Sequence, residues 1–207
     1  MALRNRSGWR MWFSDEDEKK KGEETPKTGL VEERLFKSRT VLVIGQVDHK
    51  MATAVTAQLL ALAADGDDWI NVFVSSPGGH VESGDMIYDM LKFVGPKVRV
   101  IGTGWVASAG ALIFVGAAKE NRFCLPNTRF LLHQPSGGMM GTATDIGIQA
   151  EQIIKMRDRL NKIFAHETGQ PLERIAKDTD RDHWMFPEEA IAYGLLHQVI
   201  RTKGELG

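Results

Sequence analysis

Short apolar runs alternate with longer amphipathic stretches between residues 40 and 102. The runs at 40–44, 70–75 and 98–102 are rich in Val, Ile and Phe, which predicts buried strands. In the stretches between them, at about 50–64 and 83–94, apolar residues recur at helical spacing. Continuous apolar strands separated by helices favour parallel pairing. The sequence therefore predicts an α/β fold around a parallel sheet.

The third strand leads into the small and apolar stretch 102–118, GTGWVASAGALIFVGAA. Its second half, 109–118, predicts a buried helix, which places Ser108 at a strand-to-helix turn between small residues. The first N–H groups of a helix have no partner within the helix and can face a developing negative charge. An acyl-transfer nucleophile needs that environment. Serine is also a common helix N-cap, so this stretch alone leaves both interpretations open.

The second half of the chain continues with short extended segments at 122–125 and 129–133 and a glycine-rich stretch at 134–141, QPSGGMMG. A long helix is predicted at about 142–166, followed by helices at 172–176 and 187–193 and a last strand near 198–200. In the long helix, apolar residues recur at helical spacing and charged residues lie between them. The helix either projects towards another subunit or spans the core. The apolar positions are Ile146, Ile153, Met156, Leu160, Ile163 and Phe164, and the outward ones Glu151, Lys155, Arg157 and Asp158.

Composition narrows the function classes. The 207 residues are 43% hydrophobic, enough for the core of one domain, and a net charge of −1 gives no electrostatic case for nucleic acid. The single cysteine, Cys124, excludes an internal disulfide framework, and no Cys/His cluster suggests a metal. We see neither a membrane-spanning run nor a secretory signal. A cytoplasmic protein without membrane association is expected.

The first 30 residues differ from the rest because residues 15–21, DEDEKKK, are all charged. We expect a flexible leader over residues 1–30 and one domain over residues 31–207. Trp12 and Phe13 could dock on a partner, or they are stray aromatics of a mobile segment.

A serine nucleophile needs a base. His133 closes the apolar run FLLH, which would place its ring at the end of a strand, and the other five histidines fall in predicted turns or at exposed helix ends. The turn Pro77-Gly78-Gly79 follows a predicted strand and leaves backbone N–H groups free for an oxyanion. Each of these signals is weak when taken alone.

Together, however, the pieces resemble a known family. The turn SPGG (76–79), the motif ASAGA (107–111), the motif LHQP (132–135) and the segment TGQPLERIAKDTDRD (168–182) look like the ClpP family, the proteolytic subunits of Clp proteases. The resemblance spans about residues 31–200 with the motifs in the family's order. Other serine-hydrolase classes place their triad residues in a different order along the chain.

The resemblance implies roles for particular residues. Ser108 matches the nucleophile, His133 the general base, and Asp182 the carboxylate that orients the histidine. The backbone N–H groups of Gly79 and Ala109 match the oxyanion hole. Gly137 and Gly138 lie in the glycine-rich strand with which the family binds extended substrates.

The resemblance also implies an architecture and partners. The fold would be a crotonase-like spiral of parallel strands and helices, with residues 134–166 forming a projecting handle that joins two stacked heptameric rings. Unfolded polypeptides would be hydrolysed inside that chamber. A Clp-family AAA+ unfoldase would use the ATP, so this chain would need no cofactor of its own. Two alternatives are a structural subunit that assembles with an active ClpP paralogue and a crotonase-type enzyme acting on acyl-CoA.

Three positions depart from the family pattern. Ala109 stands where methionine usually follows the nucleophile, so the adjacent pocket should change. Gly147 lies in the predicted handle helix, where a better helix former is usual. Asn71 replaces a residue that is often aromatic and helps to form the docking surface for the unfoldase.

Overall fold

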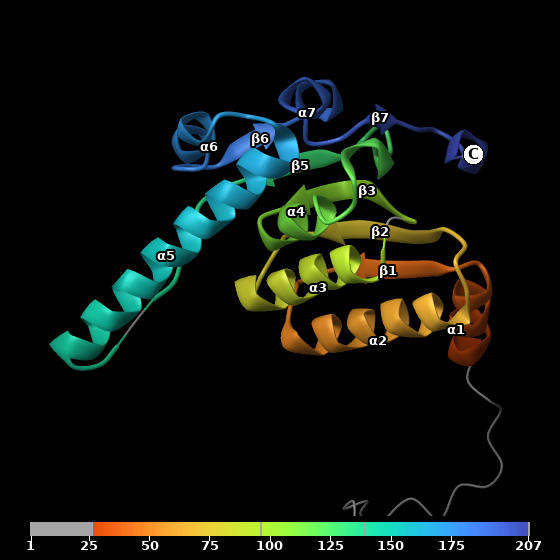
Figure 1. Ribbon diagram of the computed structural model, residues 1–207, viewed down its shortest axis with the longest axis horizontal. Coiled ribbons are helices and arrows are strands. Elements are labelled where there is room, and N and C mark those ends of the chain that lie inside the picture. Colours follow the sequence, from red (N-terminus) through yellow and green to blue (C-terminus); the bar gives the residue numbers. More distant parts are fainter. Residues whose placement is uncertain (1–26, 96, 139, 207) are drawn as a thin grey trace, which may run out of the picture.

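The sheet is the frame of the molecule, and most of its strands run parallel (Figure 1). The computed structural model describes residues 27–95, 97–138 and 140–206. The first five longer elements are α1 (Lys27–Lys37), β1 (Thr40–Ile44), α2 (His49–Asp65), β2 (Ile70–Ser76) and α3 (Val81–Phe93). They are followed by β3 (Val98–Ala107), α4 (Ala109–Phe114), β4 (Arg122–Cys124), β5 (Arg129–Leu132), α5 (Ala143–Thr168), α6 (Leu172–Asp178), β6 (His183–Met185), α7 (Pro187–Tyr193) and β7 (Gln198–Val199).

Strands β1, β2, β3, β4 and β7 are neighbours in that order, and every pair in the series is parallel. β5 is parallel to the far end of β3, and β6 pairs with β5 in the antiparallel sense. β3 can serve both groups because its pairing changes along its length, from β4 at 100–102 to β5 at 105–107. Gly104 lies between these two halves with a φ of 63°, a conformation that favours glycine. The predicted parallel α/β fold is confirmed.

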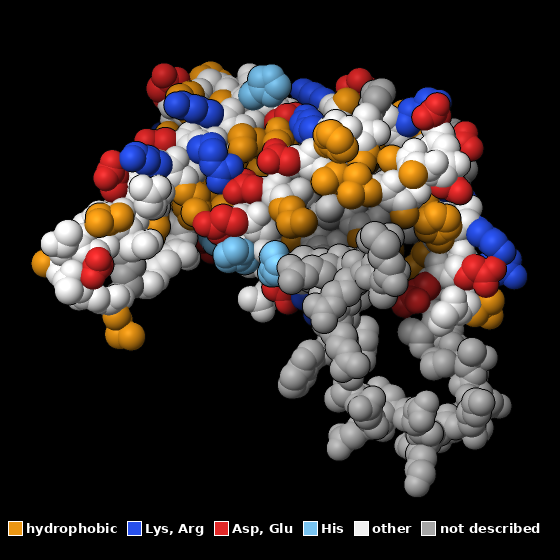
Figure 2. Space-filling view, turned by 60° about the horizontal axis from the view of Figure 1, so that its bottom comes forward, with side chains coloured by type: hydrophobic (Ala, Val, Ile, Leu, Met, Phe, Trp, Pro, Cys, Tyr) orange, Lys and Arg blue, Asp and Glu red, His pale blue; other side chains and the backbone are white. Residues whose placement is uncertain are grey.

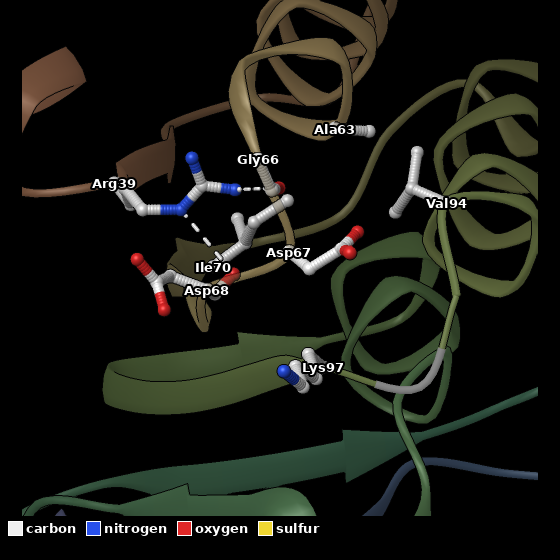
Figure 3. Close-up of a pocket in the computed structure, with 8 residues that line it drawn as sticks. All are labelled: Arg39, Ala63, Gly66, Asp67, Asp68, Ile70, Val94 and Lys97. Atoms are coloured by element: carbon white, nitrogen blue, oxygen red, sulfur yellow. Dashed lines mark hydrogen bonds between the residues drawn. The ribbon is translucent and has the colours of Figure 1, made fainter.

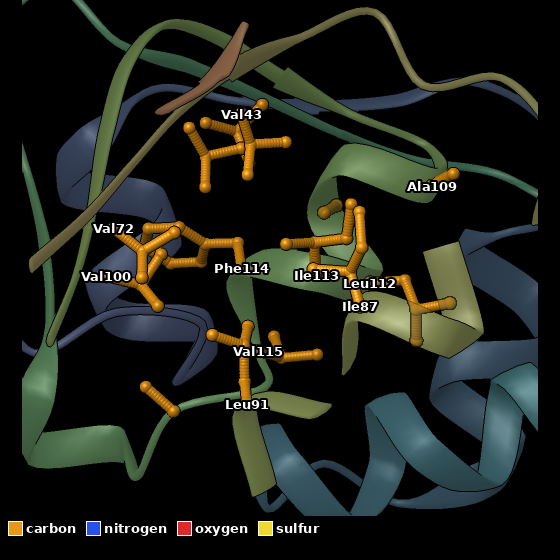
Figure 4. Packing of buried hydrophobic residues seen from close by; sticks show 14 of the residues in the cluster. Val43, Val72, Ile87, Leu91, Val100, Ala109, Leu112, Ile113, Phe114 and Val115 are labelled. Carbon is orange, nitrogen blue, oxygen red and sulfur yellow. The ribbon is translucent and has the colours of Figure 1, made fainter. Parts of the chain in front are cut away.

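The main core lies between the sheet and helices α2, α3 and α4 (Figure 4). It includes Val43, Val72 and Val100 from three adjacent strands, which lie around Phe114 of α4, while Leu112 of α4 lies beside Ile87 of α3. Phe114 and Phe130 pack edge to face, with their ring centroids 5.2 Å apart. Because α4 is buried along its whole length, the backbone that follows Ser108 has little freedom to move.

Most predicted elements are found within a few residues of their expected bounds, but four details differ. β3 continues to Ala107, five residues beyond its predicted end at 102. α1 begins at Lys27, inside the segment expected to be a flexible leader; residues 1–26 of that segment lie outside the described residues. α4 ends at Phe114 rather than near residue 118, because the chain turns at residues 115–116; Gly116 in this turn packs closely against Leu91. Strand β6 was not predicted, because its residues, His183, Trp184 and Met185, directly follow a charged segment and form no run of β-branched residues.

Helix α5 projects from the body of the molecule, as one of the two interpretations predicts (Figures 1 and 2). It starts with a capping box between Thr142 and Asp145. Every residue from 143 to 150 is exposed, whereas Leu160 and Phe164 near the other end are buried. The projecting part also exposes apolar residues, including Ile146 and Ile148. Within the described residues, no helix is both long and apolar enough to span a membrane.

A pocket at the amino ends of the first three strands has a structural role (Figure 3). Arg39 donates hydrogen bonds to the carbonyl oxygens of Leu62 and Gly66, 2.8 Å each, and of Asp68 at 3.2 Å. These carbonyls lie in the last turn of α2 and in the loop after it, where a cation stabilises the helix end. Parallel strands in α/β sheets present ligand sites at their carboxyl ends. Because this pocket lies at the amino ends of β1, β2 and β3, it is separate from the Ser108 site.

Candidate active site

Ser108 sits on a sharp turn between β3 and α4. Its backbone angles, φ 55° and ψ −122°, are unusual for a residue with a side chain and cost about 1–3 kcal/mol. Its backbone N–H donates to Leu131 O at 3.0 Å, which ties the turn to β5. Its side chain caps no helical N–H. The geometry therefore counts against the N-cap interpretation and resembles a strained nucleophile turn.

The strained turn is held by close packing against the 76–79 turn. A Cβ built on Gly78 would lie 2.5 Å from Ser108 Cβ and 3.0 Å from Ala109 N. Gly78 has a φ of 93°, so both space and conformation require glycine there. Gly110 approaches Ser76 in the same way, with a built Cβ 3.0 Å from Ser76 Cβ. The two turns therefore position each other through backbone contacts.

The N–H groups proposed for the oxyanion hole come from these two turns. Ala109 is the first residue of α4, where the N–H has no partner within the helix. Gly79, with a φ of 148°, lies beside Val47 and forms an isolated bridge with it. Within the described residues, neither the Gly79 N–H nor the Ala109 N–H donates a hydrogen bond to another backbone group. Both donors are free to face a developing negative charge.

His133 follows the last residue of β5 and pairs with Asp182. Its ring nitrogen Nδ1 lies 2.9 Å from Asp182 Oδ1. A carboxylate only accepts hydrogen bonds, so the proton belongs on Nδ1 and Nε2 is left as an acceptor. The histidine side chain is 29% exposed and the aspartate side chain 62% exposed. An ion pair this exposed contributes little to folding.

Ser108 and His133 meet in one small cavity. Ser108 and His133 both line it, and no hydrogen bond joins their side chains among the described residues. Contacts of this kind are often long in a site without substrate. The rest of the lining is mainly apolar and comes from four parts of the fold: Val81, Ala109, Leu112, Pro135, Leu160 and Phe164.

Two sets of residues in and around this site escaped the sequence analysis. Leu160 and Phe164 were expected only as positions on the long helix, and the cavity shows that the buried end of α5 forms one of its walls. Gln134 is the second case, because its amide bonds the segment that carries Asp182. Gly137 and Gly138 are both exposed, Gly137 lies near Ile153 of α5, and Met139 lies outside the described residues. Within the described part of the chain, no cluster of three or more potential ligands could hold a metal ion.

Helix α5 is anchored next to the cavity by a buried carboxylate. Glu167 accepts from Tyr88 Oη at 2.8 Å, pairs with Lys92 Nζ at 2.7 Å, and pairs with the fully buried Arg122. Burial alone would raise the pKa of Glu167. The hydrogen bonds from Lys92 and Tyr88 and the charge of Arg122 outweigh burial, so this pKa lies below its ordinary value.

Fold and site together define a class: an α/β protein with a serine on a strained strand-to-helix turn beside a histidine-aspartate pair. The chain belongs to the Clp protease family, since the family model described as Clp protease matches residues 21–203. The predicted family resemblance is confirmed.

Relatives with high sequence identity support this family assignment. A relative from Rhizobium meliloti, ATP-dependent Clp protease proteolytic subunit 3, is 59% identical over 193 residues, covering 93% of this chain and 99% of the relative. The ATP-dependent Clp protease proteolytic subunit of Paracoccus denitrificans is 65% identical over 166 residues, covering 80% and 83%.

Among solved structures, ClpP1 from Listeria monocytogenes aligns with a TM-score of 0.78 at 46% identity, covering 86% of this chain and 99% of that one. A mutant of the same protein gives a TM-score of 0.80 at 47% identity over the same coverage. The ClpP-type fold expected from the sequence is confirmed. The relatives named above are described as proteolytic subunits or ClpP1, so they favour a peptidase over the two alternative functions.

Proposed function

We propose that this chain is a serine endopeptidase, the proteolytic subunit of an ATP-dependent Clp protease. One observation carries the proposal. Ser108, on its strained turn, shares a cavity with His133, and His133 Nδ1 lies 2.9 Å from Asp182 Oδ1. The names of the relatives, proteolytic subunits of ATP-dependent Clp protease, support the same activity.

The mechanism follows from the tautomer that Asp182 selects. With Nδ1–H donating to the carboxylate, His133 Nε2 takes the proton of Ser108 as Oγ attacks the carbonyl carbon of a peptide. The N–H groups of Gly79 and Ala109 stabilise the oxyanion that forms. His133 then gives the proton to the leaving amine, and a water molecule activated by the same histidine hydrolyses the acyl-enzyme.

The substrate is an extended, unfolded polypeptide. Residues 134–138 leave β5 beside the cavity in a conformation outside any regular element, and they are exposed from Ser136 onwards. A substrate strand paired along this segment would present its carbonyl to Ser108. Strand pairing uses backbone groups and therefore accepts many substrate sequences. Folded proteins must then be protected by restricted access to the active site.

Access is restricted by assembly. The exposed apolar side chains on the projecting part of α5 suit contact with another copy of the chain. We infer two stacked heptameric rings that enclose the sites and a cytoplasmic location. An AAA+ unfoldase of the Clp family would feed the chamber and hydrolyse ATP, which leaves this chain without a cofactor.

Ser108→Ala tests the proposal. The variant should fold and assemble like the wild type but lose hydrolysis of a short fluorogenic peptide, because the cavity loses its nucleophile. Gel filtration and melting temperature serve as controls for assembly and folding. Turnover close to that of the wild type would show that Ser108 is not the nucleophile.

A paired digestion tests enclosure. The wild-type protein alone should cleave a short peptide and spare a stable folded protein, and a Clp unfoldase with ATP should add degradation of a tagged folded substrate. Rapid digestion of the folded protein without an unfoldase would contradict the chamber. If peptides are cleaved but no unfoldase enables degradation of the folded substrate, only the proposed unfoldase partner would be contradicted.

A further inference from the structure

The segment that carries Asp182 is held from its two ends. On its carboxyl side, His183 pairs with Leu132 in the antiparallel ladder between β6 and β5. On its amino side, the backbone N–H of Thr179 closes α6 by donating to Ile175 O at 2.9 Å, and Thr179 Oγ1 lies 3.0 Å from Asn161 Oδ1 of α5. Between these anchors lie Asp180, Arg181 and Asp182, all exposed.

Gln134 spans the gap between these anchors. Its backbone N–H donates to Thr179 O at 2.6 Å. Its side-chain Nε2 donates to Asp180 O at 2.8 Å and lies 3.2 Å from Asp180 Oδ1. Gln134 directly follows His133, and the same shallow pocket is lined by residues 133–136 and 180–182. The Gln134 amide therefore joins the strand that precedes His133 to the segment that carries Asp182.

We infer that Gln134 is a positioning residue, whose side-chain amide holds residues 180–182 against β5 so that Asp182 stays within hydrogen-bond distance of His133. This inference rests on the proposed function. The His133–Asp182 pair is too exposed to fix its own geometry, because water competes for both partners. A catalytic pair needs supporting hydrogen bonds that lock its members in place. The Gln134 amide is such a bond, and it acts mainly on a backbone oxygen, which mutation of the Asp180 side chain leaves intact.

Two variants remove the donor by different routes. Gln134→Leu keeps a similar volume without polar atoms, and Gln134→Glu keeps the shape but offers only acceptors. In both, kcat for a short fluorogenic peptide should fall about tenfold, as expected when one hydrogen bond is lost. KM should stay within about twofold, because the apolar lining that contacts the substrate is unchanged. Labelling of Ser108 by a serine-directed phosphonate should slow by the same factor as kcat.

Gln170 supplies a matched control. Its Nε2 donates to Tyr193 O at 2.9 Å, a bond of the same type that links the start of α6 to α7. Gln170→Leu should lower the melting temperature as much as Gln134→Leu does, or more, and leave kcat unchanged.

A double-mutant cycle separates positioning from general stabilisation. If Gln134 works through Asp182, Gln134→Leu should slow labelling of Ser108 about tenfold in the wild type and have no further effect in Asp182→Asn. A tenfold loss that persists in the Asp182→Asn background would overturn the inference. Wild-type kcat in both Gln134 variants would overturn it as well. In either case Ser108→Ala would still abolish turnover, so the proposed function would stand, whereas an active Ser108→Ala would remove the basis of both.

Discussion

The two sides of the site are built by different means. Ser108 and the N–H of Ala109 are fixed by tight packing, with Gly78 pressed against the turn and α4 buried behind it. His133 and Asp182 lie on the more exposed side and are fixed by a few polar bonds. Packed groups move only when the core moves, whereas bonded groups at the surface can shift while the fold stays intact. Mutations that disturb this packing should therefore affect stability and activity together, and mutations that remove the polar bonds should affect mainly activity.

The largest effect is expected on the polar side. Asp182→Asn keeps the shape but favours the wrong tautomer of His133, and kcat should fall about 10⁴-fold. The free energy of unfolding should change by less than about 1 kcal/mol, because the pair is exposed. Asp180→Asn is the neighbouring control and should change kcat by less than about threefold, since the main Gln134 bond goes to the Asp180 backbone. The reverse ranking in a peptidase assay would identify Asp180 as the orienting carboxylate.

The buried contacts of Glu167 that anchor α5 also belong to the packed part of the molecule. Mutation of Glu167 should have the largest effect on the free energy of unfolding. Glu167→Gln leaves Arg122 buried without its carboxylate, and the free energy of unfolding should fall by about 3–5 kcal/mol. Glu173→Gln makes the same chemical change on an exposed face of α6 and should cost less than about 0.5 kcal/mol. Equal denaturation midpoints for the two variants would show that Glu167 does not anchor the helix.

The same carboxylate predicts a dependence of stability on pH. The folded protein holds the pKa of Glu167 below its ordinary value of 4.5, so its contribution is complete above that value and is lost as the pH falls through the lower, folded pKa. Urea denaturation of the wild type and of Glu167→Gln should therefore converge as the pH drops below about 4.5. A constant difference between the two midpoints would contradict the lowered pKa.

Gly78→Ala tests the packing that holds Ser108. A methyl group at this position would meet Ser108 and the backbone of residues 107–109, and the conformation is strained for any side chain. We expect a loss of at least about 2 kcal/mol in stability, with peptidase activity falling as the turn moves. Gly45 has nearly the same φ, 95°, with nothing near its missing Cβ, so Gly45→Ala measures the strain alone. The comparison fails if both variants lose stability equally and both keep their activity.

The smallest effect concerns the shape of the cavity. Ala109→Met places a long side chain between Val81, Leu112 and the backbone near Gly84. The cavity should shrink, so kcat/KM for peptides with a large apolar residue before the cut should fall about tenfold relative to peptides with a small one. An unchanged preference across a set of such peptides would show that Ala109 does not shape this pocket.

The sequence determined the parallel α/β order, because apolar runs and helical periods are local signals. Ser108 and His133 could also be selected from the sequence, as the first follows a strand within a run of small residues and the second ends one. Asp182 could not be selected in this way, because spacing alone does not distinguish it from Asp180. Only the family resemblance favoured Asp182. Their roles in catalysis stay predictions. The structure adds that Asp182, and not Asp180, lies next to His133.

What only the tertiary structure decided depends on contacts between residues distant in sequence. The strained backbone of Ser108 results from a turn some 30 residues earlier in the chain. The walls that Leu160 and Phe164 add to the cavity depend on where α5 packs. The hydrogen bond of Gln134 to Asp180 joins positions 46 residues apart. Local patterns carry no record of such approaches, because a hydrophobic period shows which face of an element is buried but not which partner buries it.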